Sequence, residues 1–450
     1  MTLTVINPAT EEPIAELEQA GVDETDQAVA RANEAYPDWR AVSPADRGKL
    51  LRRLATLVEE HGEELAQIES RNVGKPISGA RGEIAMVAQV FHFYAGAVDK
   101  HYGQTIPAAG GEAMTFREPL GVVGLIVPWN FPLNISSWKL APALACGNTV
   151  VLKPAELTPL SALRLAELVL EAGIPEGVVN VLVGKGSVVG QRLIEHPGVA
   201  KIGFTGSTEV GRLVMQGAAG TIKRVTLELG GKSANVIFED ADLERAASSA
   251  PYAVFDNAGQ DCCARSRILV QKSVYDRFLD DLVEATKGVE VGDPADDSTE
   301  MGPLISAEHR ETVASFVDGE PAFRGETPGE RGFWFPCTIV EATNDDRVAR
   351  EEVFGPIAAV IPFEDEADAV RIANDTPFGL SGSIWTRDGA RALRVARALD
   401  TGVLSVNSNS SVRVQTPFGG FKQSGFGREL GMQGLDGYSE VKTVFISTEG

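Results

Sequence analysis

The chain has 450 residues, which is too long for one ordinary core, and 43% of them are hydrophobic, which is ample for two or three packed domains. Its formal net charge of -22 at pH 7 argues against nucleic acids and anionic membranes as partners, because both require a basic surface. No signal-peptide pattern opens the chain, and no apolar run approaches the length of a membrane span.

Acidic residues number 63 and basic residues 41, and no lysine lies between Lys287 and Lys422. A solvated acidic surface with few lysines is typical of proteins from salt-loving hosts, although acidic mesophilic proteins also exist. A halophilic host is therefore a hypothesis.

The four cysteines, at positions 146, 262, 263 and 337, show no Cys-x-x-Cys spacing. Adjacent cysteines rarely close a disulfide, so this sparse set indicates a reducing compartment. The five histidines show no ligand spacing. We therefore expect a cytoplasmic protein without a metal.

Two amphipathic patterns come first along the chain. Asp23 is expected to cap a helix at 24–35, and apolar residues recur at helical spacing through 45–72. Strands and helices then alternate. Strands are predicted at 121–127, 149–153, 178–183, 201–204 and 224–229, and helices at 133–146, 160–172, 187–195 and 208–219. Such an alternation, with strands rich in Val, Ile and Leu, indicates a parallel sheet covered on both faces.

A second alternation follows. Strands are predicted near 235–238, 267–270, 357–363, 381–386 and 402–407, with helices near 242–256, 273–286, 365–374 and 389–399. Residues 318–332 are rich in Gly, Glu and Pro and predict a surface loop. The fold class is therefore α/β, with two α/β domains.

Cys262 is the candidate nucleophile, because it lies on the loop that precedes a predicted buried strand. A cysteine is an effective nucleophile when it is deprotonated, partly exposed and close to a group that accepts protons and activates water. Glu228 is the candidate partner. On these residues alone, however, Cys262 is more simply a small buried hydrophobic residue.

Several turns predict a nucleotide site. Residues 184–190 read Gly-x-Gly-x-x-x-Gly, which misses the usual dinucleotide pattern by one residue and also suits a plain tight turn. Residues 205–207, Thr-Gly-Ser, lie at a helix start, where free N–H groups favour a phosphate. Lys153 and Glu156 follow a strand at the edge where open α/β sheets bind ligands, although a surface ion pair is the alternative.

Seven motifs resemble, in order, those of the NAD(P)-dependent aldehyde dehydrogenase superfamily, and they cover nearly the whole chain. They are VPWNFP at 127–132, KPAE at 153–156, GFTGS at 203–207, ELGGK at 228–232, GQDC at 259–262, EEVFGP at 351–356 and PFGGFK at 417–422. The resemblance implies a Rossmann-like NAD-binding domain (1–98 and 119–229), a catalytic domain (230–432) and a small β oligomerisation extension (99–118 and 433–450).

The resemblance also implies the catalytic roles. Cys262, rather than Cys263, would attack the aldehyde, and the Asn130 side chain with the Cys262 backbone N–H would hold the oxyanion. Glu228 would activate water to hydrolyse the thioester. Lys139 and Glu429 match a proton exit path.

The implied cofactor is NAD, with NADP as the alternative. Glu156 favours NAD, because its carboxylate would bind a ribose 2′-hydroxyl and repel a 2′-phosphate, although Lys153 could offset that charge. The implied cofactor-binding residues are Trp129, Lys153, Glu156, Gly186, Thr205, Gly206, Ser207, Leu229, Glu352 and Phe354.

The residues that match the family's substrate tunnel combine two carboxylates with aromatic surface: Phe131, Ile135, Trp138, Asp256, Asp261, Ser411 and Phe418. This set favours a cationic or polar aldehyde, and GQDC resembles bacterial aminobutyraldehyde dehydrogenases. Arg413 suggests instead a semialdehyde acid such as succinate semialdehyde. The two carboxylates could also belong to the general acidic excess and face away from the tunnel.

Two other classes of protein share the fold. A coenzyme A-acylating relative does not need Glu228, and a non-catalytic relative leaves the Asn130, Glu228 and Cys262 set unexplained. The stretch 315–334 is shorter than the family pattern, and the substrate-anchor loop, 407–415, is unusually polar. Segments 99–118 and 433–450 match those that join subunits, so a homodimer or homotetramer is expected.

Overall fold

The structure, a computed structural model, describes residues 2–449. One of its two large sheets has six strands in the order β19-β9-β8-β5-β6-β7, and all but β19 run parallel. These strands are β5 (Val122–Ile126), β6 (Thr149–Lys153), β7 (Val179–Val181), β8 (Lys201–Thr205), β9 (Arg224–Glu228) and β19 (Gly425–Phe426). The parallel strands match the strands predicted for the first alternation.

Helices cover both faces of this sheet. Alternate residues of a strand point to opposite faces, so a single strand contributes side chains to two cores. Val123 and Leu125 of β5 join a core with α2 to α6, whereas Val122 and Ile126 join a core with α1, α7 and α8. The helices are α1 (Val22–Ala41), α2 (Pro44–Glu60), α3 (Gly62–Val73), α4 (Ile77–Ala97), α5 (Pro132–Ala145), α6 (Leu160–Glu171), α7 (Gln191–Glu195) and α8 (Thr208–Ala219).

The second large sheet has seven strands in the order β12-β13-β14-β11-β10-β16-β17, parallel except for β12. They are β10 (Ala234–Ile237), β11 (Arg267–Gln271), β12 (Phe323–Arg324), β13 (Thr338–Glu341), β14 (Ile357–Phe363), β16 (Ser381–Trp385) and β17 (Val403–Val406). The helices of this region are α9 (Leu243–Phe255), α10 (Tyr275–Lys287), α11 (Ala307–Ala314), α12 (Arg347–Arg350), α13 (Glu366–Asn374) and α14 (Gly389–Ala398).

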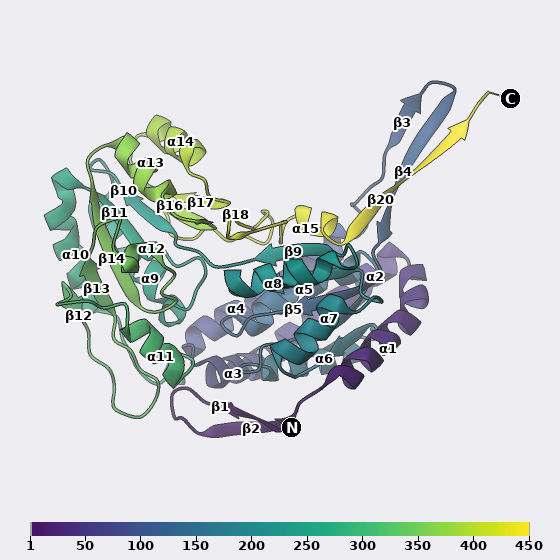
Figure 1. The fold of residues 1–450 in the computed structure, drawn as a ribbon, viewed down its shortest axis with the longest axis horizontal. Coiled ribbons are helices and arrows are strands. Elements are labelled where there is room, and N and C mark those ends of the chain that lie inside the picture. Colours follow the sequence, from purple (N-terminus) through teal and green to yellow (C-terminus); the bar gives the residue numbers. More distant parts are fainter. Residues whose placement is uncertain (1, 450) are drawn as a thin grey trace.

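A three-stranded antiparallel sheet, β20-β4-β3, projects from the body of the molecule (Figure 1). It consists of β3 (Thr105–Ala108), β4 (Gly111–Pro119) and β20 (Ser439–Ser447). The smaller elements are β1 (Thr2–Ile6) paired with β2 (Pro13–Glu18), β15 (Phe378–Gly379) paired with β18 (Phe421–Lys422), and α15 (Gln433–Asp436). Within residues 2–449, no helix is long and apolar enough to cross a bilayer.

The structure corrects several predicted boundaries. Asp23 is not the cap of α1, because Gly21 holds that position and its N–H donates to the Glu24 carboxylate at 2.7 Å. The pattern at 45–72 divides at His61 into α2 and α3, and the helix predicted at 187–195 divides into a π-helical turn and α7. β19 lies within the range predicted for the catalytic domain but pairs with β9. The division into domains stays a prediction.

Candidate active site

A cavity of about 770 Å³ lies along the carboxyl ends of β5, β6, β8 and β9. Open parallel sheets bind ligands at this edge, where the N-termini of the following helices face the ligand. We name it the coenzyme cavity. All ten predicted cofactor-binding residues line it: Trp129, Lys153, Glu156, Gly186, Thr205, Gly206, Ser207, Leu229, Glu352 and Phe354. The sequence thus identified one continuous surface from segments far apart in the chain.

Cys262 also lines the coenzyme cavity, together with Asn130 and the two predicted substrate residues Phe131 and Ile135. Cys262 is half-buried, whereas Cys263 is 5% exposed. The other two cysteines do not line this cavity; Cys337 is buried and Cys146 caps the C-terminus of α5. Of the four cysteines, which all lie within residues 2–449, Cys262 is therefore the one exposed to a ligand in this cavity.

The loop before Cys262 is fixed by side-chain amides. Asn130 Nδ2 donates to the Gln260 carbonyl at 2.9 Å, and Asn257 Nδ2 donates to the Asn130 carbonyl at 3.0 Å. Gln260 Nε2 in turn donates to the Asn257 carbonyl at 2.9 Å. Asn257 and Ala258 adopt left-handed φ angles of 49° and 57°, which non-glycine residues rarely do. This network holds the Asn130 amide beside the nucleophile loop.

The segment 228–232 contacts the same loop. A Cβ atom at Gly231 would overlap with the Cys262 carbonyl, so only glycine permits this approach. The Gly231 N–H donates to Glu352 Oε1 at 2.8 Å, which connects the EEVFGP motif at 351–356 to the site. Burial raises the pKa of Glu352 to about 7, although the Gly231 N–H and Lys232 act in the opposite direction. The segments that contain Glu228 and Cys262 therefore lie in contact, and their action as one active site stays a prediction.

Acidic and thiol groups surround Cys262. Its Sγ, the Sγ of Cys263 and a carboxylate oxygen of Asp261 lie within 4.8 Å of one another. The Cys263 thiol, burial and the charges of Asp261 and Glu352 raise the pKa of Cys262 well above its usual range. The thiol is therefore protonated at neutral pH in the protein alone. Because these three atoms are possible metal ligands, the predicted absence of a metal stays a prediction.

Glu228 ends β9 and is 4% exposed. Neither of its carboxylate oxygens has a hydrogen-bond partner among residues 2–449. Burial raises its pKa well above the usual range, and the charge of Glu429 adds to this, whereas Lys139 lowers it. Lys139 contacts Glu429 directly, and both side chains are buried. A buried, unpaired carboxyl with a raised pKa can take up a proton near neutral pH.

The polar cofactor-binding residues differ in what they already contact. Glu156 Oε2 accepts from the Gly186 N–H at 3.3 Å, and Ser207 Oγ caps α8 by accepting from the Val210 N–H at 3.3 Å. The Thr205 hydroxyl is buried without a partner among residues 2–449. Burial lowers the pKa of Lys153, and Glu156 opposes this shift. These polar groups line the cavity and can still form hydrogen bonds with a ligand.

The other five predicted substrate residues, Trp138, Asp256, Asp261, Ser411 and Phe418, do not line the coenzyme cavity. Trp138 and Phe418 pack edge to face, with ring centroids 5.1 Å apart, in the hydrophobic cluster against which Phe131 and Cys262 pack. Asp261 Oδ1 accepts from the Cys263 N–H at 2.8 Å. Ser411 Oγ accepts from the Arg265 guanidinium at 2.6 Å. Trp138 and Phe418 thus share a hydrophobic cluster with Cys262, and Asp261 belongs to the nucleophile loop itself.

Asp256 is accessible to solvent, but nearby protein atoms displace part of the water around its carboxyl group. This loss of hydration, with repulsion from Asp261, raises its pKa to about 6, and Lys75 opposes the shift. Lys75 Nζ lies 4.6 Å from the centroid of the Phe131 ring. It also pairs with Glu83 at 2.6 Å and lies 3.5 Å from Glu69. The residue over Phe131 is therefore a buried ammonium whose charge is balanced by Glu69 and Glu83.

Sequence reasoning missed Arg265, which is 4% exposed and whose charge acts to lower the pKa of Asp261. Its guanidinium donates to the Cys263 carbonyl at 2.8 Å, to Ser411 Oγ at 2.6 Å and to Ser383 Oγ at 3.2 Å. It therefore joins the nucleophile loop to the predicted substrate-anchor loop. No sequence periodicity predicts the contacts with Ser383 and Ser411, because both residues lie more than a hundred positions from Arg265.

His309 was also missed. Its Nε2 lies 2.7 Å from the Phe354 carbonyl, and its ring centroid lies 5.5 Å from that of Trp129. Both partners line the coenzyme cavity. His309 therefore fixes α11 behind this cavity.

Comparison with known proteins agrees with this geometry. The model of the aldehyde dehydrogenase family matches residues 1–444. Betaine aldehyde dehydrogenase of Bacillus subtilis is 43% identical over 99% of this chain and 94% of its own length. Retinal dehydrogenase 2 of Gallus gallus is 45% identical over 98% of this chain and 88% of its own length.

Among solved structures, betaine aldehyde dehydrogenase from Staphylococcus aureus, in complex with NAD+, superposes with a TM-score of 0.97. It is 38% identical, and the match covers 100% of this chain and 92% of the other. The predicted α/β fold, the enzyme class and the NAD cofactor are confirmed. The chain belongs to the aldehyde dehydrogenase family and is an NAD(P)-dependent enzyme that oxidises aldehydes.

Proposed function

We propose that Cys262, Asn130 and Glu228 carry out the oxidation of an aldehyde to a carboxylic acid. The observation that carries this proposal is the position of Cys262, which lines the coenzyme cavity beside Asn130 while its carbonyl abuts Gly231. NAD supplies the hydride acceptor when it is bound. The protein must then supply a nucleophile, an oxyanion donor and a base.

In the first step, the Cys262 thiol loses its proton to water, and the resulting thiolate adds to the aldehyde carbon to form a thiohemiacetal oxyanion. Asn130 Nδ2 has a second N–H beyond the one donated to Gln260, and this N–H is available to the oxyanion. Loss of hydride from the same carbon leaves a thioester on Cys262. Removal of one oxyanion donor typically slows such a reaction by roughly 100 to 1000-fold, so Asn130→Ala is expected to lose activity on that scale.

In the second step, water attacks the thioester, the thiolate leaves and the acid is released. Glu228 is suited to take the water proton, because burial and Glu429 raise the pKa of its carboxyl. The buried Lys139–Glu429 pair lies next to Glu228 in this charge network and offers an exit for the proton. Coenzyme A is not needed in this sequence.

The preferred coenzyme is NAD. Glu156 lines the coenzyme cavity with its carboxylate beside the Gly186 N–H, where a ribose hydroxyl would gain a hydrogen bond and a phosphate would meet a like charge. The ratio of kcat/KM for NAD and NADP tests this proposal. A preference for NADP would overturn it.

The proposed substrate is an amino aldehyde or another polar, cationic aldehyde. Phe131, Trp138 and Phe418 offer aromatic faces in the cluster against which Cys262 packs, and Asp256 adds a solvent-accessible carboxyl. Aromatic faces and carboxylates both attract ammonium groups, as the Lys75 ammonium over Phe131 illustrates. Two similar proteins are named for betaine aldehyde, a cation, whereas another is named for retinal, which is uncharged.

A semialdehyde acid is the second candidate, and Arg265 is the observation that favours it. The hydrogen bonds of this buried cation go to neutral oxygen atoms, including Ser411 Oγ of the substrate-anchor loop. Arg413, in contrast, is exposed and donates to Ser410 Oγ and the Val412 carbonyl of its own loop.

Steady-state kinetics with 4-aminobutanal, betaine aldehyde, succinate semialdehyde and hexanal, without coenzyme A, separate these candidates. A cationic substrate is expected to give the highest kcat/KM, and Asp256→Asn should reduce that advantage. A large advantage for succinate semialdehyde would overturn the cationic proposal.

The proposed assembly is a homodimer or homotetramer. The projecting sheet carries exposed hydrophobic side chains on β4 and β20, including Phe116, Val441, Phe445 and Ile446. Strands with open edges and apolar side chains are normally covered by a partner. A monomeric mass by light scattering in concentrated salt would contradict this assembly.

A further inference from the structure

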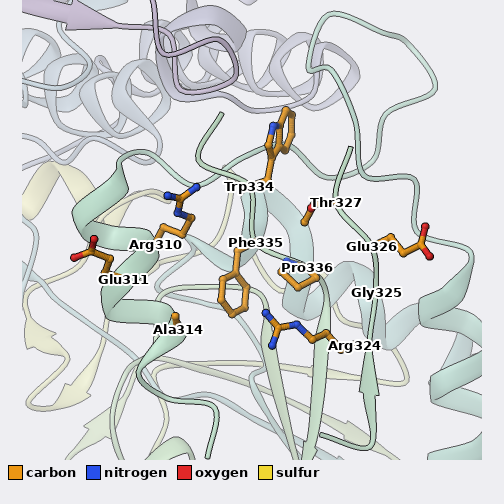
Figure 2. A pocket seen from close by; sticks show the side chains of 10 residues that line it. All are labelled: Arg310, Glu311, Ala314, Arg324, Gly325, Glu326, Thr327, Trp334, Phe335 and Pro336. Carbon is orange, nitrogen blue, oxygen red and sulfur yellow. The ribbon is translucent and has the colours of Figure 1, made fainter. Parts of the chain in front are cut away.

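A second cavity, of about 580 Å³, lies between α11 and the segment 324–336 (Figure 2). It shares no lining residue with the coenzyme cavity. We name it the α11 cavity, after the helix that forms one of its walls.

Two arginines line the α11 cavity, Arg310 and Arg324. Figure 2 shows Arg310 and Arg324 among the side chains that line the cavity, whereas the carboxylates of Glu311 and Glu326 point away from it. Neither arginine forms an ion pair within residues 2–449, and Arg310 donates only weakly, to the Gly332 carbonyl at 3.3 Å. In a chain of net charge -22, two unpaired guanidinium groups in one cavity leave capacity for an anion.

Aromatic surface lies between the two arginines. The Arg324 guanidinium carbon lies 5.8 Å from the centroid of the Phe335 ring, which is 4% exposed. The Trp334 indole N–H donates to the Arg331 carbonyl at 2.5 Å, and this bond holds the indole at the cavity wall. Arginine and aromatic faces together favour planar molecules with negative charge.

We infer that the α11 cavity is a binding site for a small organic anion, one that carries an acid group on a planar ring. The acid group, a phosphate or a carboxylate, accepts hydrogen bonds from Arg310 and Arg324. The ring packs against Phe335 and Trp334. A cavity of this volume accommodates a molecule of that size.

Occupation of the α11 cavity should also change NAD affinity, because α11 separates it from the coenzyme cavity. Arg310 adjoins His309, whose ring contacts the Phe354 carbonyl and Trp129. Val313, one turn further along α11, packs so closely on Gly355 that a Cβ atom there would overlap with it. A shift of α11 is therefore transmitted to residues that line the coenzyme cavity, and linkage requires the effect to be reciprocal.

The test is calorimetric titration of the full chain, saturated with NAD so that the coenzyme cavity is closed to the probe. Phenyl phosphate is the probe, and benzoate, inorganic phosphate and phenol are the comparison compounds. Phenyl phosphate or benzoate is expected to bind one site per chain, and the stronger of the two identifies the acid group. Inorganic phosphate and phenol, which each lack one recognition element, should bind several-fold more weakly.

Arg310→Gln and Arg324→Gln should each weaken binding roughly tenfold, since each removes charge-assisted hydrogen bonds. Arg397→Gln, on the exposed face of α14, is the matched control and should change nothing. Thr327→Glu adds a carboxylate to the cavity wall without removing a structural contact, so it tests the site if an arginine variant fails to fold. Absence of binding to the unmodified protein, or equal binding to all variants, overturns the site.

The coupling is tested by the NAD dissociation constant with and without phenyl phosphate. A change in the unmodified protein that is lost in Arg310→Gln supports coupling through α11. An unchanged constant in the unmodified protein overturns the coupling. The same change in both proteins also overturns it, because it indicates direct competition in the coenzyme cavity.

Discussion

On the outer surface, many carboxylates pair with cationic side chains in solvent, whereas Glu228, whose segment contacts the Cys262 loop, is buried without a hydrogen-bond partner within residues 2–449. Glu366 accepts from Arg394 at 2.8 Å, and this hydrogen bond lowers its pKa. Glu228 lacks a hydrogen-bond partner within residues 2–449, and burial raises its pKa. One residue type thus serves two purposes. A paired surface carboxylate keeps its charge at neutral pH, and an unpaired buried one becomes a base.

The largest expected effect is on dehydrogenase activity, which should depend on the accessible Cys262 thiol and not on its buried neighbour Cys263. Cys262→Ala should lower dehydrogenase activity roughly 1000-fold or more while NAD binding persists, because the nucleophile is lost. Cys263→Ala is the matched control, since Cys263 is 5% exposed and does not line the coenzyme cavity. NADH formation and NAD titration check both variants. Loss of activity in Cys263→Ala alone would contradict the assignment.

The pH dependence of Cys262 alkylation sharpens the comparison. The pKa of this thiol is raised, so the thiolate fraction at neutral pH is small and increases roughly tenfold per pH unit below the pKa. Iodoacetamide should therefore modify the coenzyme-free enzyme faster as pH rises from 6 to 8.5, and modification should fall as pH decreases. Peptide mapping identifies the modified cysteine. A rate independent of pH in this range would mean that the thiolate is already formed.

Substitution of a buried arginine should lower the free energy of unfolding more than substitution of an exposed one. Arg265→Met leaves the Cys263 carbonyl, Ser383 and Ser411 without their donor, so a loss of roughly 2 kcal/mol in the free energy of unfolding is expected. Arg413→Met, at an exposed position, should change it by less than about 0.5 kcal/mol. Urea unfolding of both variants checks this difference. Equal losses would refute the role given to Arg265.

The smallest effect concerns the surface alone. The net charge of -22 means that surface carboxylates repel one another. Salt screens this repulsion, because the Debye length falls from about 10 Å at 0.1 M salt to about 3 Å at 1 M. If the acidic surface is an adaptation to salt, the unfolding midpoint should rise in molar KCl. A midpoint that stays constant or falls would end the halophilic hypothesis.

Much of this organisation could be predicted from the sequence. Runs of Val, Ile and Leu predicted the buried parallel strands. The coenzyme residues could be predicted at the carboxyl ends of these strands, because such ends share one edge of a sheet. α4 could not be predicted in this way. It packs against α2, α3 and α5, so its apolar residues face several directions and blur the helical period.

Other features depend on tertiary contacts that no local pattern encodes. Asn257, one of two adjacent left-handed residues, donates a side-chain hydrogen bond to the Asn130 carbonyl, 127 positions away, and the Arg265 contacts join two distant loops. The raised pKa of Glu228 likewise depends on burial and on Glu429, which is distant in sequence. Residue identities were therefore predictable at the site, but their charge states were not.

The central claim is that Cys262 and Glu228 act in successive steps of one active site, and Glu228→Gln tests it most directly. This variant should still transfer hydride but hydrolyse the thioester slowly, because only the second step needs the base. Rapid mixing with NAD and a good aldehyde substrate should give a burst of one NADH per active site, and mass spectrometry should find the acyl group on Cys262. Steady turnover without a burst or an adduct, or an adduct on Cys263, would contradict the claim.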